Sequence, residues 1–133
     1  MMYLYEFKAF KHENTLRPLI PVTITNPVTG KSMFTYALLD TGADECALPA
    51  SYAETLGHNL EAGTKQVIKT GNGISEAYSH TVNIAINGFK TSNVKIDFLP
   101  NLSYALIGVK SFLSNFVVTI DYPKKTFTLK KDN

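Results

Sequence analysis

The sequence predicts an all-β domain with a small barrel-like core and one or two short helices. Three observations support this fold class. Apolar β-branched and aromatic residues alternate with polar ones in short runs such as 82–86 and 94–98, which is the pattern of half-buried strands. Turn signals such as Asn-Gly and Pro-Asn separate the runs at short intervals. The segments with helical character span only about two turns, so they depend on tertiary packing.

Length and composition favour one globular domain over residues 1–133, with residues 1–16 as an N-terminal strand or extension. The chain is 44% hydrophobic and carries a net charge of +2, which gives no reason to expect nucleic acid or an anionic membrane as a partner. No window approaches the ~18 continuous apolar residues of a membrane span, and no signal-peptide pattern is present. We therefore expect a cytoplasmic protein.

The residues that bind metals or form disulfides are few and scattered. Cys46 is the only cysteine, and the three histidines are widely separated in sequence, so neither a disulfide nor a metal site is expected. Cys46 lies in an apolar run, where a small buried thiol is a better interpretation than a nucleophile. We expect no cofactor.

The first third of the chain is predicted to form an N-terminal strand and a hairpin. Alternating aromatic residues at 3–7 indicate the first strand. A β-branched run at 22–25 and the segment 32–39 flank an Asn-Pro-Val-Thr-Gly turn, in which Gly30 can take a positive φ. This hairpin leads the chain to Asp40.

The middle of the chain combines a short helix with a second hairpin. Residues 50–56 follow a proline and end at Gly57, which suits the polarity of a helix. Strands are predicted at 66–70 and 75–80, with an Asn-Gly turn between them. This hairpin is polar and rich in glycine at its tip, and an ordinary exposed turn is the alternative interpretation.

The C-terminal half shows the clearest strand signals. Residues 82–98 predict an antiparallel hairpin around Asn-Gly, because apolar residues alternate on both sides of the turn. A short apolar run at 104–108 ends in glycine and is followed by a possible helix at 109–114. The segment 116–121 is predicted to be a buried strand, and 126–130 an alternating strand that returns beside it.

One stretch carries the chemistry. The apolar run 37–39 ends at Asp40, the chain turns through Thr-Gly-Ala, and an apolar run resumes at 46–49. Gly42 permits a tight turn that a residue with a Cβ would resist. An aspartate that merely caps a surface turn is the alternative for a bare Asp-Thr-Gly. The apolar flanks instead favour a carboxylate set at the end of a buried strand.

The stretch 37–49 resembles the active-site loop of the retropepsin-like aspartic proteases, the single-domain relatives of pepsin. Later features follow in a similar order: a glycine-tipped hairpin, a long regular hairpin, and Leu106-Ile107-Gly108 before a short helix. The resemblance covers about 17–129. It implies a closed acid-protease barrel and hydrolysis of extended polypeptides. Such proteases use two neighbouring carboxylates, and Asp-Thr-Gly occurs once here, so we expect a homodimer with one Asp40 from each copy.

The resemblance also implies roles for single residues. Asp40 is the catalytic residue. The Thr41 hydroxyl joins the two catalytic loops across the dimer, and Gly108 lets two backbones approach closely. An extended peptide would bind through backbone hydrogen bonds, as in strand addition. Its contacts are expected with the loop residues Gly42, Ala43 and Asp44 and with the tip of a mobile flap at Gly71, Asn72, Gly73 and Ile74.

The sequence departs from the retroviral pattern at several positions. Asn72 replaces a flap glycine, and Val109-Lys110 stands where an arginine commonly follows the glycine. Arg17 resembles an arginine that pairs with an aspartate of the partner subunit. Ala43 replaces the serine usual in pepsins, which removes a donor that would stabilise the ionised carboxylate, so we predict activity at weakly acidic to neutral pH.

Two functional hypotheses follow. The first is an active aspartic endopeptidase that works as a homodimer on peptide or protein substrates. The alternative is a catalytically silent peptide-binding or dimerisation module with the same fold. The intact Asp-Thr-Gly favours the first, because a scaffold has no reason to keep a carboxylate at that position.

Overall fold

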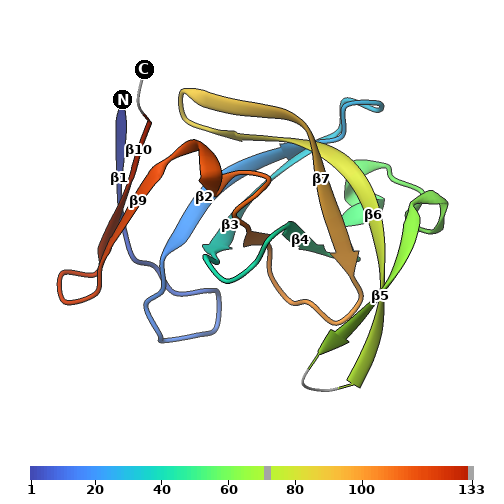
Figure 1. Cartoon of the computed structure of the whole chain (residues 1–133), viewed down its shortest axis with the longest axis horizontal. Helices are drawn as coiled ribbons and strands as arrows, with labels where there is room; N and C mark the ends of the chain where they lie inside the picture. The colour runs from blue at the N-terminus through green and yellow to red at the C-terminus, as the bar shows by residue number, and fades with distance from the viewer. Residues whose placement is uncertain (71–72, 132–133) are drawn as a thin grey trace.

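A computed structural model describes residues 1–70 and 73–131 and confirms a mostly β fold with one short α-helix (Figure 1). In the part of the chain described, no helix is long and apolar enough to cross a membrane. The strands are β1 (Met2–Glu6), β2 (Leu19–Thr25), β3 (Ser32–Leu39), β4 (Cys46–Pro49), β5 (Thr64–Thr70), β6 (Gly73–Ile86), β7 (Phe89–Leu99), β8 (Leu106–Ile107), β9 (Val117–Asp121) and β10 (Thr126–Lys130).

The larger sheet contains seven strands in the order β2-β3-β8-β4-β7-β6-β5. A further antiparallel pairing of β2 with β6 closes this sheet on itself. The two hairpins predicted around 22–39 and 82–98 are both present, as β2–β3 and β6–β7. The closed sheet encloses a core of fully buried side chains that includes Ile20, Ile24, Leu48, Ile84, Phe98 and Ile107.

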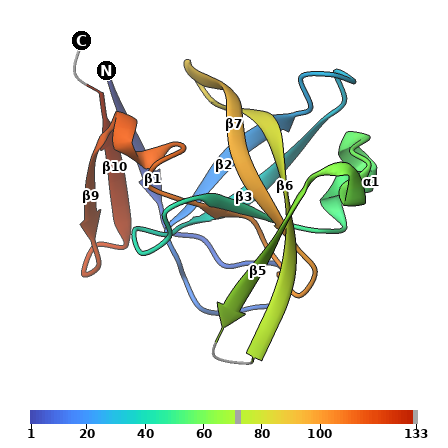
Figure 2. The ribbon, with the colours of Figure 1, turned by 45° about the vertical axis from the view of Figure 1, so that its right-hand side comes forward.

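The smaller sheet joins the two ends of the chain. β10 lies between β1 and β9, and both pairings are antiparallel, so the termini lie side by side (Figure 2). On its inner face the Tyr5 ring stacks on Phe127, with centroids 5.0 Å apart. On its outer face Leu4 is 65% and Val117 54% exposed. The strand predicted at 116–121 is present as β9, but the prediction that it is buried was wrong, because β9 is an edge strand whose residues are exposed or only partly buried.

The helical segments are short, as the sequence predicted. α1 (Tyr52–Leu56) ends at Gly57, whose φ of 75° is left-handed and which donates its N–H to the Glu54 carbonyl. A 3₁₀ turn, η1 (Leu60–Ala62), follows it. The predicted helix at 109–114 is wrong: the structure has a turn followed by the 3₁₀ turn η2 (Leu113–Asn115).

Backbone hydrogen bonds explain that difference. The N–H groups of Val109 and Lys110 donate to the carbonyls of Ala43 and Asp44, each over 2.8 Å. Within the segment, the N–H groups of Leu113 and Ser114 donate to the carbonyls five residues back, those of Gly108 and Val109, rather than four back as in an α-helix. The amides of Val109 and Lys110 fix the segment to the loop after β3, which contains Asp40.

Candidate active site

Asp40 directly follows β3 and is fixed by backbone contacts on two sides. Its N–H donates to the Ile107 carbonyl over 3.0 Å, and its Oδ1 accepts the Gly42 N–H over 3.0 Å. Behind it, Leu39 is buried and donates its N–H to the Pro18 carbonyl over 3.0 Å. The Asp40 residue itself is only partly buried. The fold therefore holds one oriented carboxylate with access to solvent.

β8 passes between β3 and β4 and determines the shape of the loop that contains Asp40. It pairs in parallel with β3 through Leu38–Leu106 and antiparallel with β4 through Ala47–Leu106. At Gly108, which follows β8, a Cβ atom would overlap the Glu45 carbonyl and lie 3.0 Å from the Ala43 carbonyl oxygen. The close approach of two backbones therefore requires glycine at this position.

The sequence predicts that Gly42 permits a tight turn, but the structure gives this residue a different role. Its φ lies outside the left-handed region, and a Cβ there would meet Asp40 Oδ1 at 3.4 Å as its nearest atom. The turn does not need the conformational freedom of glycine. A side chain at this position would instead occupy the space directly beside the carboxylate.

The other loop residues lie at the surface of the single chain. Thr41 and Asp44 are exposed, while Ala43 is partly buried and donates its N–H to the Asp40 carbonyl over 3.2 Å. Lys110, which stands near the position of a retroviral arginine, lies 4.0 Å from Asp44 Oδ2, with both side chains exposed. Such a pair contributes at most about 1 kcal/mol.

Arg17 forms its ion pair within the chain. Its Nε lies 3.5 Å from Glu13 Oε1. Its main chain is held by paired hydrogen bonds with Lys8, 2.8 and 3.0 Å long. In the single chain, this side chain therefore lies beside a carboxylate of its own chain, although its Nε makes no hydrogen bond among the described residues.

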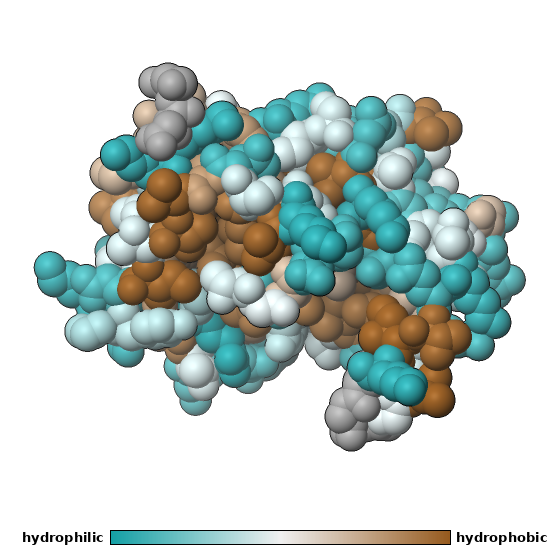
Figure 3. Space-filling view, viewed as in Figure 1, coloured by the Kyte–Doolittle hydropathy of each residue, from teal (hydrophilic) through white to brown (hydrophobic). Residues whose placement is uncertain are grey.

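The β5–β6 hairpin, for which the sequence predicted a flap, projects from the body of the molecule (Figure 2). Gly71 and Asn72 of the expected tip lie outside the described residues. Gly73 and Ile74 begin β6, and the Ile74 side chain is 73% exposed. Figure 3 shows the apolar surface beside this tip, to which the exposed side chains of Val67 and Ile74 belong.

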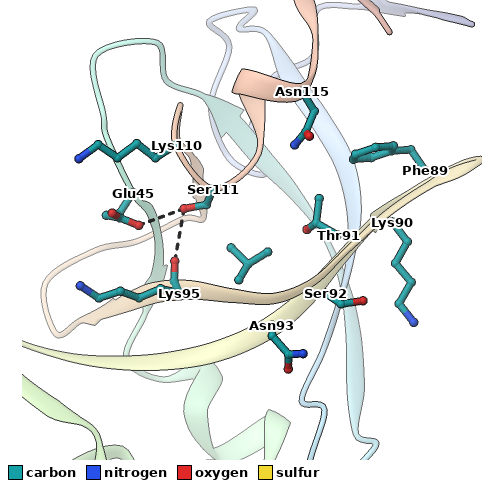
Figure 4. Close-up of a pocket in the computed structure, with 11 residues that line it drawn as sticks. Glu45, Phe89, Lys90, Thr91, Ser92, Asn93, Lys95, Lys110, Ser111 and Asn115 are labelled. Atoms are coloured by element: carbon teal, nitrogen blue, oxygen red, sulfur yellow. Dashed lines mark hydrogen bonds between the residues drawn. The ribbon is translucent and has the colours of Figure 1, made fainter. Parts of the chain in front are cut away.

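Cys46 and Ser111 support the loop from behind. Cys46 is fully buried, and its Sγ accepts the Gly108 N–H over 3.3 Å. Burial is the main cause that raises the pKa of this thiol to about 11, so it is a poor nucleophile. Ser111 Oγ lies 3.1 Å from Glu45 Oε2 and 3.3 Å from the Lys95 carbonyl (Figure 4).

Ser111 was not identified from the sequence. It faces an open pocket between the first half of β7 and the turn before η2, and it joins the loop after Asp40 to β7 (Figure 4). The only sequence signal was its place three residues after Gly108. A lone serine there carries no periodicity or motif of its own, so only the tertiary structure reveals its contacts.

The comparisons with known proteins agree with this geometry. The family described as "gag-polyprotein putative aspartyl protease" matches residues 27–115. A retropepsin-like aspartic protease from Rickettsia conorii has a similar structure, with 23% identity, a TM-score of 0.68, and coverage of 97% of this chain and 91% of that one. The EIAV protease complexed with the inhibitor HBY-793 has 24% identity, a TM-score of 0.51, and coverage of 76% and 88%. No curated protein sequence matches.

The family match spans most of the chain, and the two structures share its fold. The chain therefore belongs to the retropepsin-like aspartic protease family.

Proposed function

We propose that this protein is an aspartic endopeptidase that acts as a homodimer. The observation that carries the proposal is the state of Asp40: its backbone is bound to β8, its Oδ1 is held by the Gly42 N–H, and the residue is open to solvent. A carboxylate held in one orientation at the end of a buried strand is suited to general acid–base chemistry.

The chemistry requires a second carboxylate, and a two-fold axis supplies it. Two Asp40 groups that face each other cannot both ionise easily, so the pair shares one proton and titrates as a unit. The ionised member accepts a proton from a water molecule, which attacks the carbonyl carbon of the peptide. The protonated member donates a hydrogen bond to the developing oxyanion. The proton that was taken from the water then passes to the nitrogen of the leaving amine.

The decisive experiment compares the wild type with Asp40→Asn on a mixed peptide library. We expect cleavage by the wild type and a loss of at least ~10³-fold in Asp40→Asn, because the amide cannot take the proton from water. Asp121→Asn is the matched control: it makes the same chemical change at the end of β9, where Asp121 Oδ1 accepts the Lys124 N–H.

Each outcome decides between the two hypotheses. Cleavage that is lost only in Asp40→Asn supports the endopeptidase. Equal cleavage by all three proteins would point to a contaminating protease. Peptide binding without cleavage by the wild type would favour the silent binding module. Sedimentation of the wild type as a monomer at every concentration would remove the shared dyad.

A further inference from the structure

Strand pairing places a row of side chains across the larger sheet, on the face that carries Asp40. Paired residues of neighbouring strands project to the same face, and side chains alternate along each strand. Leu38 lies two residues before Asp40, so both belong to one face, and the Asp40 N–H continues the pairing with β8. The row that starts there runs through Leu38, Leu106, Ala47, Asp97 and Ser79.

The row changes from apolar to polar with distance from Asp40. Its first three members are aliphatic, whereas Asp97 is a carboxylate that is only 8% exposed. Ser79 Oγ donates to Asp97 Oδ1 over 2.6 Å, and Gln66 Nε2 donates to Ser79 Oγ over 2.8 Å. The polar end of the row therefore joins β7, β6 and β5 at the base of the flap hairpin.

The second oxygen of Asp97 is not engaged by the chain. Among the described residues Oδ2 has no hydrogen-bond partner. It is also not one of the fully buried side-chain atoms that lack a partner, so it remains in contact with solvent. The three ion pairs in the described part of the chain join Arg17 to Glu13, Lys65 to Glu76 and Lys110 to Asp44, and Asp97 is in none of them.

A carboxylate in this position favours a cation. A largely buried charge is costly unless it is paired and hydrogen-bonded, and Ser79 supplies only one neutral donor. Lys95, two residues earlier on the same face of β7, is exposed, and its Nζ forms none of these ion pairs. A bound ligand with a positively charged group could complete the site.

We propose that Asp97 is a specificity-determining residue that selects a lysine or arginine side chain of the substrate peptide. The inference rests on the proposed function. The aliphatic stem of such a side chain can lie over Ala47 while its charged end reaches Asp97. A charge-assisted hydrogen bond there is stronger than one from a neutral donor.

The position of the basic residue follows from strand spacing. β3 and β7 are three strand steps apart in the sheet order, which is roughly 14 Å at about 4.8 Å per step. An extended peptide advances about 3.4 Å per residue. The basic side chain should therefore lie within about four residues of the cleaved bond.

The first test compares peptides that carry lysine or norleucine at each of these positions, because norleucine keeps the aliphatic stem without the charge. We expect the wild type to cleave the lysine peptide about tenfold faster at one position, as a charged hydrogen bond allows. In Asp97→Asn this ratio should fall to about one, and in Asp97→Glu it should largely persist. Asp121→Asn is the control and should keep the wild-type ratio.

The second test measures binding of the same peptides to Asp40→Asn, with and without Asp97→Asn, so that it does not depend on hydrolysis. A preference for lysine that requires Asp97 supports the subsite even if the wild type cleaves nothing, in which case only the proposed endopeptidase fails. Cleavage of lysine and norleucine peptides at equal rates by the wild type overturns the subsite and leaves the endopeptidase standing. Neither cleavage nor binding overturns both.

Discussion

At the scale of single residues, backbone atoms determine the candidate site as much as side chains do. Asp40 is positioned by the Gly42 N–H and the Ile107 carbonyl. The sequence could predict a carboxylate at the end of a strand and a close approach at Gly108. It could not predict that the Glu45 carbonyl faces Gly108, because that contact depends on how β8 passes the loop.

The contact at Gly108 gives a prediction at this scale. Gly108→Ala should lower the free energy of unfolding by about 3 kcal/mol, because the added Cβ must displace the backbone of Glu45 or of β8. Denaturation with urea measures the change. Gly30→Ala is the control: its φ is +75° but no atom lies within 4 Å of the added Cβ, so only about 1–2 kcal/mol of conformational strain is expected. An equal loss in both variants would show that steric overlap is not the cause.

At the scale of elements, two histidines connect the segment after α1 to β6. His58 Nε2 donates to the Thr81 carbonyl over 3.2 Å, and His80 Nε2 donates to the Leu60 carbonyl over 2.8 Å. Their rings lie 4.9 Å apart, and both pack against Phe98. The sequence showed these histidines only as distant residues, because the fold that joins them depends on long-range pairing of β6.

This contact predicts a loss of stability in weak acid. Burial, and secondarily the charge of His80, lower the pKa of His58 below its usual value, although the hydrogen bond to Thr81 opposes the shift. The unfolded chain then binds more protons than the folded one between the lowered pKa and about 6.5. The thermal midpoint should therefore fall as the pH decreases from 7 through this window.

The comparison is with His58→Gln, whose side chain can still donate to the Thr81 carbonyl but does not titrate. Its thermal midpoint should change less between pH 7 and pH 5 than that of the wild type. Scanning calorimetry at several pH values measures both slopes. Identical slopes would assign the acid sensitivity to other groups.

At the scale of the whole molecule, local patterns predicted the all-β class and the order of the main hairpins. Periodicity describes one strand at a time, so it could not show that β2 pairs with β6 and closes the sheet. For the same reason it did not place Asp97 on the face of Asp40, although both residues were visible as aspartates. The segment 109–114 was mispredicted because its first two amides bond to the loop after β3, while those of Leu113 and Ser114 bond to carbonyls five residues back rather than four.

The whole molecule also has a surface that suits a second copy. The chain provides one Asp40, whereas the proposed reaction needs two. Leu4 and Val117 are exposed on the outer face of the terminal sheet, beside the paired chain ends. Burial of side chains of this size contributes about 1.5–3 kcal/mol each. Because a two-fold interface uses each residue twice, we expect this face to contribute strongly to dimer formation.

The last prediction follows from that surface. If only the dimer holds a complete dyad, specific activity should fall when the protein is diluted below its dimer dissociation constant. Leu4→Lys combined with Val117→Lys should raise this constant at least ~10-fold, because apolar burial is lost and like charges meet across the axis. Val28→Lys is the matched control, since Val28 is 90% exposed in the turn between β2 and β3. Sedimentation and activity should shift together in the double variant; a shift of equal size in Val28→Lys, or wild-type activity independent of concentration, would contradict an interface at the terminal sheet.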